Sequence, residues 1–247
     1  MSPDKYEEAM RRGNSAAWDQ EWQDAVGFYQ MALAEAPDDP KALLSLGLAY
    51  LEMQDYPEAL AAYRKAAQAT PDDPIPMEKV AQVSEEVGDI PRAVKAAMQA
   101  ASLYGKKGDI NKAIENWTFV TRINPQELQA HSRLAMTYEK SGRTPQAVTE
   151  YLFIAGLLQH DGKQDDASQV LGHAQQLDPG NEQVAQAINL VQKGQPLPLP
   201  ARPREVMRPP DLSKVPQLET PKDSDTAARK MDPVEETRKA AMAELAR

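Results

Sequence analysis

The stretch from Lys41 to Asp73 (KALLSLGLAYLEMQDYPEALAAYRKAAQATPDD) constrains the fold most, because it has the pattern of a helical hairpin. Its first half places apolar residues and one glycine three or four positions apart, which is the spacing of one helix face. These residues are Leu43, Leu46, Gly47 and Tyr50. Its second half repeats the spacing with Ala59, Tyr63 and Ala66 and stops at Pro71, which cannot continue a helix. We therefore predict two helices joined by a turn.

Copies of this hairpin lie on both sides of it. A hairpin of this size cannot bury its own apolar face and has to stack on neighbours. An alanine recurs at the hairpin crossing in six copies: Ala25, Ala59, Ala93, Ala113, Ala147 and Ala167. A small or aliphatic residue follows seven positions later: Ala32, Ala66, Ala100, Val120, Ile154 and Ala174. The repetition predicts a row of stacked hairpins.

By these residues the chain resembles the tetratricopeptide repeat family, whose pattern extends over about 34 residues. The resemblance covers roughly Tyr6 to Gly194, and the second unit matches best. The first unit has Arg12 before Gly13 and Ala16 in place of a tyrosine, which suits a terminal repeat. The resemblance implies an all-α fold, a right-handed superhelix (α-α solenoid) of about 11 helices over residues 1–194.

The spacing of the six alanines departs twice from a uniform array. The differences between their successive residue numbers are 34, 34, 20, 34 and 20. We interpret the short intervals as shared helices, in which Ile90 to Tyr104 and Thr144 to Gln159 each end one hairpin and begin the next. The regular assignment of groove residues is therefore expected to stop at about residue 90.

Composition excludes several classes of function. The net charge is −9, and residues 1–193 hold 18 basic and 28 acidic side chains, so nucleic acid is not an expected partner. No cysteine is present. The repeated Pro-Asp-Asp-Pro segments at residues 37–40 and 71–74 are read as helix stops followed by acidic N-caps, rather than as a metal site. We expect no cofactor and no metal.

The N-terminal residues lack the charged and apolar regions of a secretory signal. The longest apolar run, Tyr151 to Leu158, is much shorter than the roughly 20 residues of a membrane-spanning helix. We therefore expect no membrane insertion and a cytoplasmic protein.

The composition changes after Gly194. Eight prolines crowd residues 196–221, so we predict a proline-rich, disordered linker over residues 195–231. Residues 232–247 return to helical signals, with Asp232 as the cap and Pro233 in the first turn. We predict a short amphipathic helix there, which either docks on a surface or begins a truncated region.

No set of residues points to catalysis. The three histidines, His131, His160 and His173, fall on different predicted helices without the paired spacing of a metal site. The segment Gly105-Lys106-Lys107-Gly108 follows a helix, where a glycine stop with basic residues is the ordinary explanation. We expect no enzyme and name no catalytic residue.

The family resemblance implies that the first helix of each hairpin lines a concave groove that holds peptides. The groove candidates are Met10, Asn14, Lys41, Leu44, Leu48, Lys79, Gln82, Met98 and Met136. Leu152 and Phe153 would extend the apolar part of this groove. Some family members grip a peptide's terminal carboxylate with a clamp of Lys, Asn and Arg side chains. Asn14 and Lys79 match that clamp, but Met10, Ser45 and Ile75 replace its other residues, which disfavours it here.

We therefore predict a non-catalytic protein-protein interaction scaffold that binds a peptide or helix of a partner protein in its concave groove. Two alternatives remain open. One is a self-assembling structural protein, a homo-oligomer that uses its apolar ends or groove. The other is a docking or regulatory domain of a larger protein.

Overall fold

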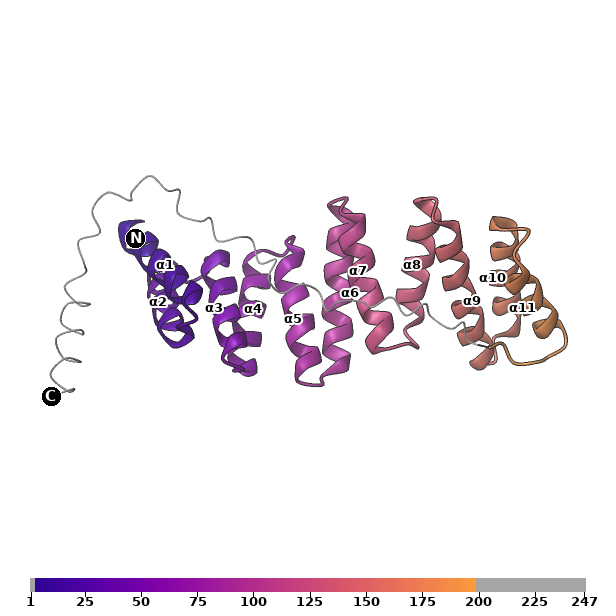
Figure 1. Ribbon diagram of the computed structural model, residues 1–247, viewed down its shortest axis with the longest axis horizontal. Coiled ribbons are helices and arrows are strands. Elements are labelled where there is room, and N and C mark those ends of the chain that lie inside the picture. Colours follow the sequence, from indigo (N-terminus) through magenta and orange to yellow (C-terminus); the bar gives the residue numbers. More distant parts are fainter. Residues whose placement is uncertain (1–2, 199–247) are drawn as a thin grey trace. The chain divides into compact units, whose positions relative to one another are not determined.

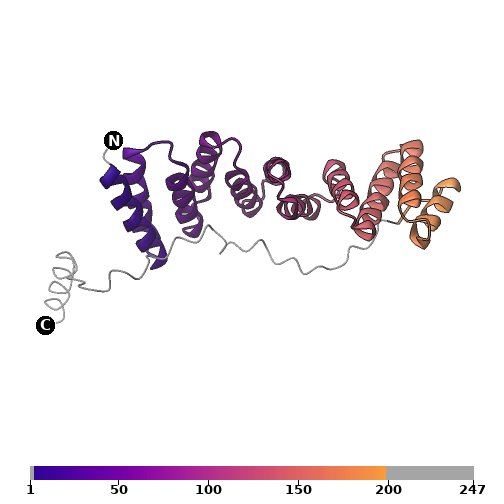
Figure 2. The ribbon, with the colours of Figure 1, turned by 90° about the horizontal axis from the view of Figure 1, so that it is seen from above.

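The computed structural model describes residues 3–198. In this part of the chain there are eleven α-helices and no strand. They are α1 (Pro3–Trp18), α2 (Trp22–Glu35), α3 (Pro40–Glu52), α4 (Tyr56–Ala69), α5 (Pro74–Glu86), α6 (Ile90–Lys106), α7 (Ile110–Ile123), α8 (Leu128–Lys140), α9 (Thr144–His160), α10 (Gln164–Leu177) and α11 (Glu182–Gln192). Figures 1 and 2 show them in one row that follows the chain. The predicted α-α solenoid is confirmed; the predicted helix at 232–247 and the predicted linker beyond residue 198 lie outside the described residues.

The solenoid contains two kinds of repeat. From α1 to α4 the unit is a two-helix hairpin, and the interval from the start of α3 at Pro40 to the start of α5 at Pro74 is one such unit. From Pro74 onward the unit has three helices. Helices α8, α9 and α10 have the same lengths as α5, α6 and α7 and the same spacing from one helix to the next, and α11 then begins a further unit. The irregular alanine spacing in the sequence is thus a regular three-helix repeat.

The middle helix of each three-helix unit packs on both sides. Helix α6 makes extensive contact with α5 and with α7, and α9 does the same with α8 and α10. Both are longer than the other helices, and small residues on several faces of α6 let its two neighbours approach closely. These residues include Ala93, Ala96, Ala97, Ala100 and Ala101, which are all buried. The prediction that these two stretches are shared between hairpins is confirmed.

Aspartates begin most helices in the first half of the row. The Asp39 carboxylate accepts a hydrogen bond from the backbone N–H of Ala42 at 2.8 Å, and Asp73 accepts one from Ile75 at 3.2 Å. Prolines at the first helical positions follow both caps, where a missing N–H has no consequence. The two Pro-Asp-Asp-Pro segments are therefore helix boundaries. No group of three metal-ligating side chains is present among residues 3–198.

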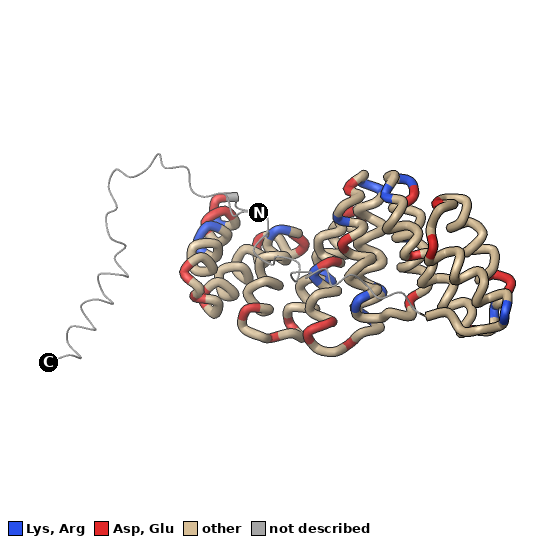
Figure 3. Tube along the Cα trace, turned by 45° about the vertical axis from the view of Figure 1, so that its right-hand side comes forward, with Lys and Arg blue, Asp and Glu red and all other residues tan. Residues whose placement is uncertain are grey.

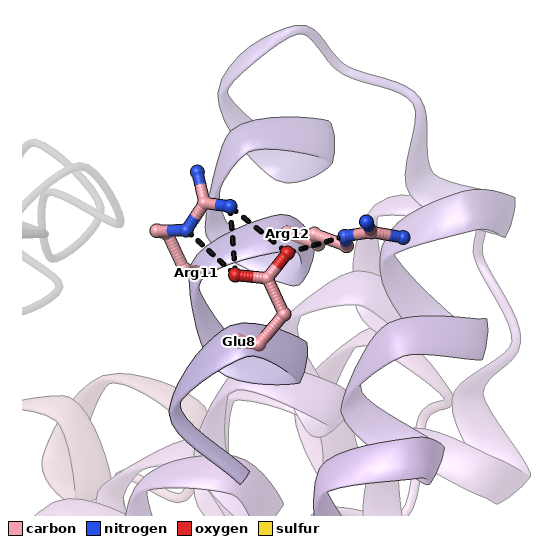
Figure 4. Close-up of polar contacts among 3 residues, drawn as sticks. All are labelled: Glu8, Arg11 and Arg12. Atoms are coloured by element: carbon pink, nitrogen blue, oxygen red, sulfur yellow. Dashed lines mark hydrogen bonds and ion pairs between the residues drawn. The ribbon is translucent and has the colours of Figure 1, made fainter. Parts of the chain in front are cut away.

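The two ends of the row differ from its interior in residue type. At positions where the second hairpin buries Ala42 and Leu46, the first hairpin carries Glu8 and Arg12. Figure 4 shows that the Glu8 carboxylate accepts hydrogen bonds from both Arg11 and Arg12, at 2.7 Å each for the shortest contacts. At the other end, α11 buries one face and leaves polar residues exposed. Polar outer faces of this kind are typical of the terminal repeats of a solenoid.

The described helices contain no stretch that is both long enough and apolar enough to cross a bilayer.

Candidate functional site

Helices α1, α3 and α5 are each the first helix of a repeat unit, and equivalent positions on them are separated by the same number of residues. Three rows of equivalent side chains therefore cross these helices. The rows are Met10–Leu44–Glu78, Arg11–Ser45–Lys79 and Asn14–Leu48–Gln82. We call these nine residues the α1–α3–α5 face. Six of the nine predicted groove residues belong to it, and a seventh, Lys41, is exposed in the first turn of α3.

The apolar members of this face differ in how much they belong to the core. Met10 and Leu44 are half-buried and pack against buried core residues. Leu48 is also half-buried, but it is not among the side chains that pack against a core cluster in the described residues. Leu48 therefore belongs less to the core than the other two apolar residues of the face.

Near α1, a polar side-chain group lies beneath the third row. The Tyr29 hydroxyl donates a hydrogen bond to Oδ1 of Asn14 at 3.0 Å, which fixes the Asn14 side chain. Burial raises the pKa of Tyr29 to about 12, and a hydrogen bond with Ser45 opposes this shift. The Tyr29 phenol is thus neutral at ordinary pH and joins α1 to α3 under the face.

At the α5 end the face carries a cation. Lys79 is half-buried, and its Nζ donates a hydrogen bond to Oε1 of Gln82 at 3.3 Å. Burial lowers the pKa of Lys79, Glu78 opposes that shift, and the nearby Lys112 adds to it. Figure 3 shows acidic positions along the described helices with basic positions between them.

The two remaining groove candidates lie on other helices. Met136 occupies the position on α8 that Gln82 occupies on α5, one three-helix unit later, and is 46% exposed. Met98 lies on the shared helix α6 and packs against core residues on both of its sides. It therefore contributes mainly to the interior.

The predicted extension of the apolar groove to Leu152 and Phe153 is wrong. Both side chains are buried, and Phe153 stacks on the His131 ring with centroids 5.2 Å apart. Both residues lie on α9, which is covered by α8 on one side and by α10 on the other. Apolar residues on this shared helix belong to the core because helices pack on two of its sides.

The histidines take part in separate contacts between helices. Buried His131 on α8 lies with Nδ1 2.6 Å from the Glu150 carboxylate and Nε2 3.1 Å from the Pro125 carbonyl oxygen. His173 on α10 approaches Glu139 on α8 at 3.0 Å, while His160 is exposed. Both His131 and His173 link neighbouring helices, which is a structural task.

Lys112 is the residue near this site that sequence reasoning missed. It lies on α7, and its ammonium is close enough to Lys79 to affect the pKa of that residue. The sequence feature that indicates this neighbour is the short interval between Ala93 and Ala113. Because α6 is shared, α7 packs next to it, and side chains of α7 reach α5, as the ion pair between Arg122 and Glu85 shows. A uniform assignment of two-helix hairpins hides this neighbour.

A family model for the tetratricopeptide repeat matches residues 8–74. This range holds the second hairpin entire and most of the first, and the later helices repeat the same crossing alanines. This part of the chain belongs to the tetratricopeptide repeat family. No curated protein matches it.

The chain is similar to several solved structures. The TPR2B domain of yeast Sti1, solved in a complex with pHsp70, has 22% identity over 50% of this chain and 98% of that domain, with a TM-score of 0.46. PcrH, solved with the chaperone binding region of PopD, has 20% identity over 51% of this chain and 96% of its own, with a TM-score of 0.48. A tetratricopeptide repeat protein from Parabacteroides merdae has 14% identity over 77% of this chain and 86% of its own, with a TM-score of 0.38.

Proposed function

We propose that this protein is a non-catalytic interaction scaffold that binds a peptide or helix of a partner protein across the α1–α3–α5 face. The observation that carries the proposal is the row Asn14–Leu48–Gln82. Its three side chains are half-buried at equivalent positions on α1, α3 and α5, and its apolar member is not among the residues that pack against a core cluster. Such a row offers a partner an apolar contact flanked by two amides.

The amides give the row a directional component. Asn14 and Gln82 each carry hydrogen-bond donors and acceptors that match a peptide backbone. Asn14 is oriented by the Tyr29 hydroxyl, and Gln82 by the Lys79 ammonium. Because both amides are held in place before a ligand arrives, less conformational entropy is lost on binding.

The test is a selection of peptides from a displayed random library on the immobilised full chain. Selected peptides are synthesised, and their affinities are measured by fluorescence anisotropy with the unaltered chain and with Leu48→Arg. We expect Leu48→Arg to weaken binding at least about tenfold, since it removes an apolar contact and introduces a charge.

The matched control is Val87→Arg, the same type of change at the residue that ends α5, which is 42% exposed and lies outside the face. It should leave the affinities unchanged, and circular dichroism should show all three proteins equally helical. Equal binding by Leu48→Arg, or a selection without peptides that bind the unaltered chain, contradicts the proposal.

A hollow at the α1 end supports self-association as a second candidate function. It has a volume of about 460 Å³ and is lined by Phe28 and Met31, with two cations and two carboxylates around them (Lys5, Arg12, Glu8 and Glu35). Since these charges balance locally, a second copy of this chain meets less repulsion here than on the acidic surface elsewhere. Sedimentation of the full chain at several concentrations, with Met31→Glu as the variant, tests this; a monomer at every concentration rules it out.

A further inference from the structure

Trp18 is the most exposed of the large apolar side chains among residues 3–198, with 75% of its surface accessible to solvent. It ends α1, and Met53, which is 37% exposed, caps the end of α3. The turns that follow them, from α1 to α2 and from α3 to α4, lie at the same edge of the row because successive helices run in opposite directions (Figure 1). We call residues 18–24 and 52–58 the Trp18–Met53 edge.

The two turns of this edge are neighbours in the fold. Helix α2 packs on α3, and one buried cluster contains Ala17 from the last turn of α1, Val26 from α2 and Ala49 from the last turn of α3. The ends of α1 and α3 thus share one core, and a ligand can contact both turns at once.

Two aromatic rings fix the edge to the core. Trp22 and Tyr56 occupy equivalent positions at the start of α2 and α4, are half-buried and pack against buried clusters. Neither Trp18 nor Met53 is among the side chains that pack against a core cluster in the described residues. A partner can therefore contact these two side chains without any rearrangement of the core.

The charged side chains of the edge are all acidic. Figure 3 shows acidic positions along the lower edge of the first helices, where these turns lie. The edge has six carboxylates and no lysine or arginine, and within residues 3–198 none of the six takes part in an ion pair. They are Asp19, Glu21, Asp24, Glu52, Asp55 and Glu58.

The next turn along this side of the row, between α5 and α6, differs in its electrostatics. It also exposes an apolar residue, Val87, which is 42% exposed. Two of its carboxylates have cationic partners, however: Asp89 pairs with Arg92 at 3.1 Å, and Glu85 pairs with Arg122 at 2.7 Å. Exposed apolar side chains and uncompensated carboxylates therefore occur together at the first two turns and not at the third.

Both turns of the edge also hold a side chain where a glycine fits better. Gln20 and Gln54 have φ angles of 61° and 59°, and they are the non-glycine residues with positive φ in the described part of the chain. The α5–α6 turn has Gly88 at the equivalent position, where this left-handed conformation is free of steric strain. The two exposed glutamines add hydrogen-bonding amides to the edge at a cost in stability.

The chemistry of the edge favours a cationic ligand. An indole ring attracts the charge of Lys or Arg more strongly than other aromatic rings do, and Asp19 and Glu21 lie close to Trp18 in the chain, where they can pair with the same cation. The cation–π contacts within the described helices involve other rings. The six carboxylates repel nucleic acid, anionic lipid headgroups and the same edge of a second copy of the chain.

We propose that the Trp18–Met53 edge binds a cationic segment of a partner protein, in which Arg or Lys stands next to apolar residues. One cation of the segment lies over the Trp18 ring and pairs with the neighbouring carboxylates, and an apolar side chain packs on Met53. The edge is formed by turns and is distinct from the α1–α3–α5 face. The inference therefore goes beyond the proposed function and does not depend on it.

The test uses a pool of synthetic twelve-residue peptides, acetylated and amidated, each with Arg and Leu at varied positions among Ser residues. One companion pool has Glu in place of Arg, and another has Ser in place of Leu. Peptides retained by the immobilised full chain are identified by mass spectrometry. Their affinities are then measured by fluorescence anisotropy at low and at physiological ionic strength.

We expect the best Arg–Leu peptide to bind at least about tenfold more tightly than its Glu or Ser counterpart, and more weakly as salt is added. Trp18→Ser should weaken it about tenfold, because this variant removes the ring and leaves every carboxylate in place. The double variant Glu21→Gln/Glu52→Gln should weaken it about fivefold, since two of the six charges are removed.

Two controls separate this site from general attraction to an acidic protein. Val87→Ser removes the exposed apolar residue of the α5–α6 turn. Asp165→Asn/Asp166→Asn removes two exposed charges from α10. Both should keep the affinity within about twofold of the unaltered chain. A loss with either control as large as that with the matching edge variant contradicts the proposal.

Trp18 also serves as a probe of the edge. Its fluorescence should be quenched by acrylamide and should move to shorter wavelength when the peptide binds, and Trp18→Phe should remove both effects. If Trp18 is protected from acrylamide without peptide, another part of the chain or a second copy covers the edge, and the proposal is wrong.

The remaining outcomes distinguish this edge from the α1–α3–α5 face. Peptides whose affinity falls with Leu48→Arg but not with Trp18→Ser lie on that face; they support the scaffold proposal and overturn this one. A pool from which the full chain retains no Arg–Leu peptide overturns the edge site as well, whatever the displayed library yields for the face.

Discussion

The Tyr63 ring on α4 packs directly against the backbone of Gly47 on α3. A Cβ atom added to Gly47 would lie 2.6 Å from Cε1 of Tyr63, and the ring is only 1% exposed. Gly13 and Tyr29 show the same relationship in the first hairpin, also at 2.6 Å. In both hairpins the two helices cross where the glycine has no side chain, which explains the Leu-Gly element of the repeat.

Gly47→Ala should destabilise the protein by about 1–3 kcal/mol, because the buried Tyr63 ring cannot move aside without disturbing the core. Urea unfolding followed by circular dichroism measures this. Gly27→Ala in α2 is the control: nothing lies within 4 Å of its added Cβ, and alanine favours a helix, so a stability gain of up to about 1 kcal/mol is expected there. Two substitutions with the same effect would argue against the close crossing.

Asp39→Ala should lower stability by about 1–2 kcal/mol, since Asp39 caps α3 and also accepts a hydrogen bond from the Tyr6 hydroxyl at 2.6 Å. Its neighbour Asp38 is exposed and serves as the control, with Asp38→Ala expected within about 0.5 kcal/mol of the unaltered protein. Thermal unfolding compares the three proteins. A loss for Asp38→Ala as large as that for Asp39→Ala would refute the capping assignment.

His131→Leu should destabilise the contact between α8 and α9 by about 2–3 kcal/mol, because it leaves the Glu150 carboxylate and the Pro125 carbonyl oxygen without the ring nitrogens that they face. The double variant His131→Leu/Glu150→Leu should recover part of this loss, because the stranded carboxylate is removed as well. Denaturant unfolding of His131→Leu, Glu150→Leu and the double variant gives the coupling free energy between the two residues. Strictly additive losses of stability would contradict the contact between His131 and Glu150.

The Glu139 carboxylate should make the free energy of unfolding depend on pH in the acidic range. Hydrogen bonds from His173 and from the Tyr151 hydroxyl hold the pKa of Glu139 below its usual range. A depressed carboxyl pKa stabilises the folded state above the pKa of the unfolded chain, and this contribution is lost as pH falls through the folded value. The unaltered protein should therefore lose more stability than Glu139→Gln between about pH 5 and pH 3. Parallel pH curves in thermal unfolding would contradict the assignment.

The candidate face could be predicted in part. Met10, Leu44, Leu48, Lys79 and Gln82 fall on equivalent positions because the period of the hairpin places them on one side of α1, α3 and α5. The period alone does not distinguish Leu48 from Leu44, which packs against core residues. That difference arises from the neighbouring helix, whose distance and tilt are not encoded in the spacing of a single hairpin.

Sequence alone determined the features that depend on residues a few positions apart. Helix faces, the Asp-Pro boundaries at residues 39–40 and 73–74, and the close crossing at Gly47 all follow from local spacing, capping and sterics. The shared helices were also evident from the short alanine intervals, since a hairpin partner must lie within reach of the chain.

Only the tertiary structure decided which side chains meet across helices that are distant in the sequence. It buried Phe153 against His131 and brought Lys112 near Lys79, although nothing in the periods of α7 or α9 indicates either contact. The physical reason is that burial and electrostatic energy depend on the distance between side chains in space. Two helices of the same amphipathic pattern become core or surface according to what packs on their second face.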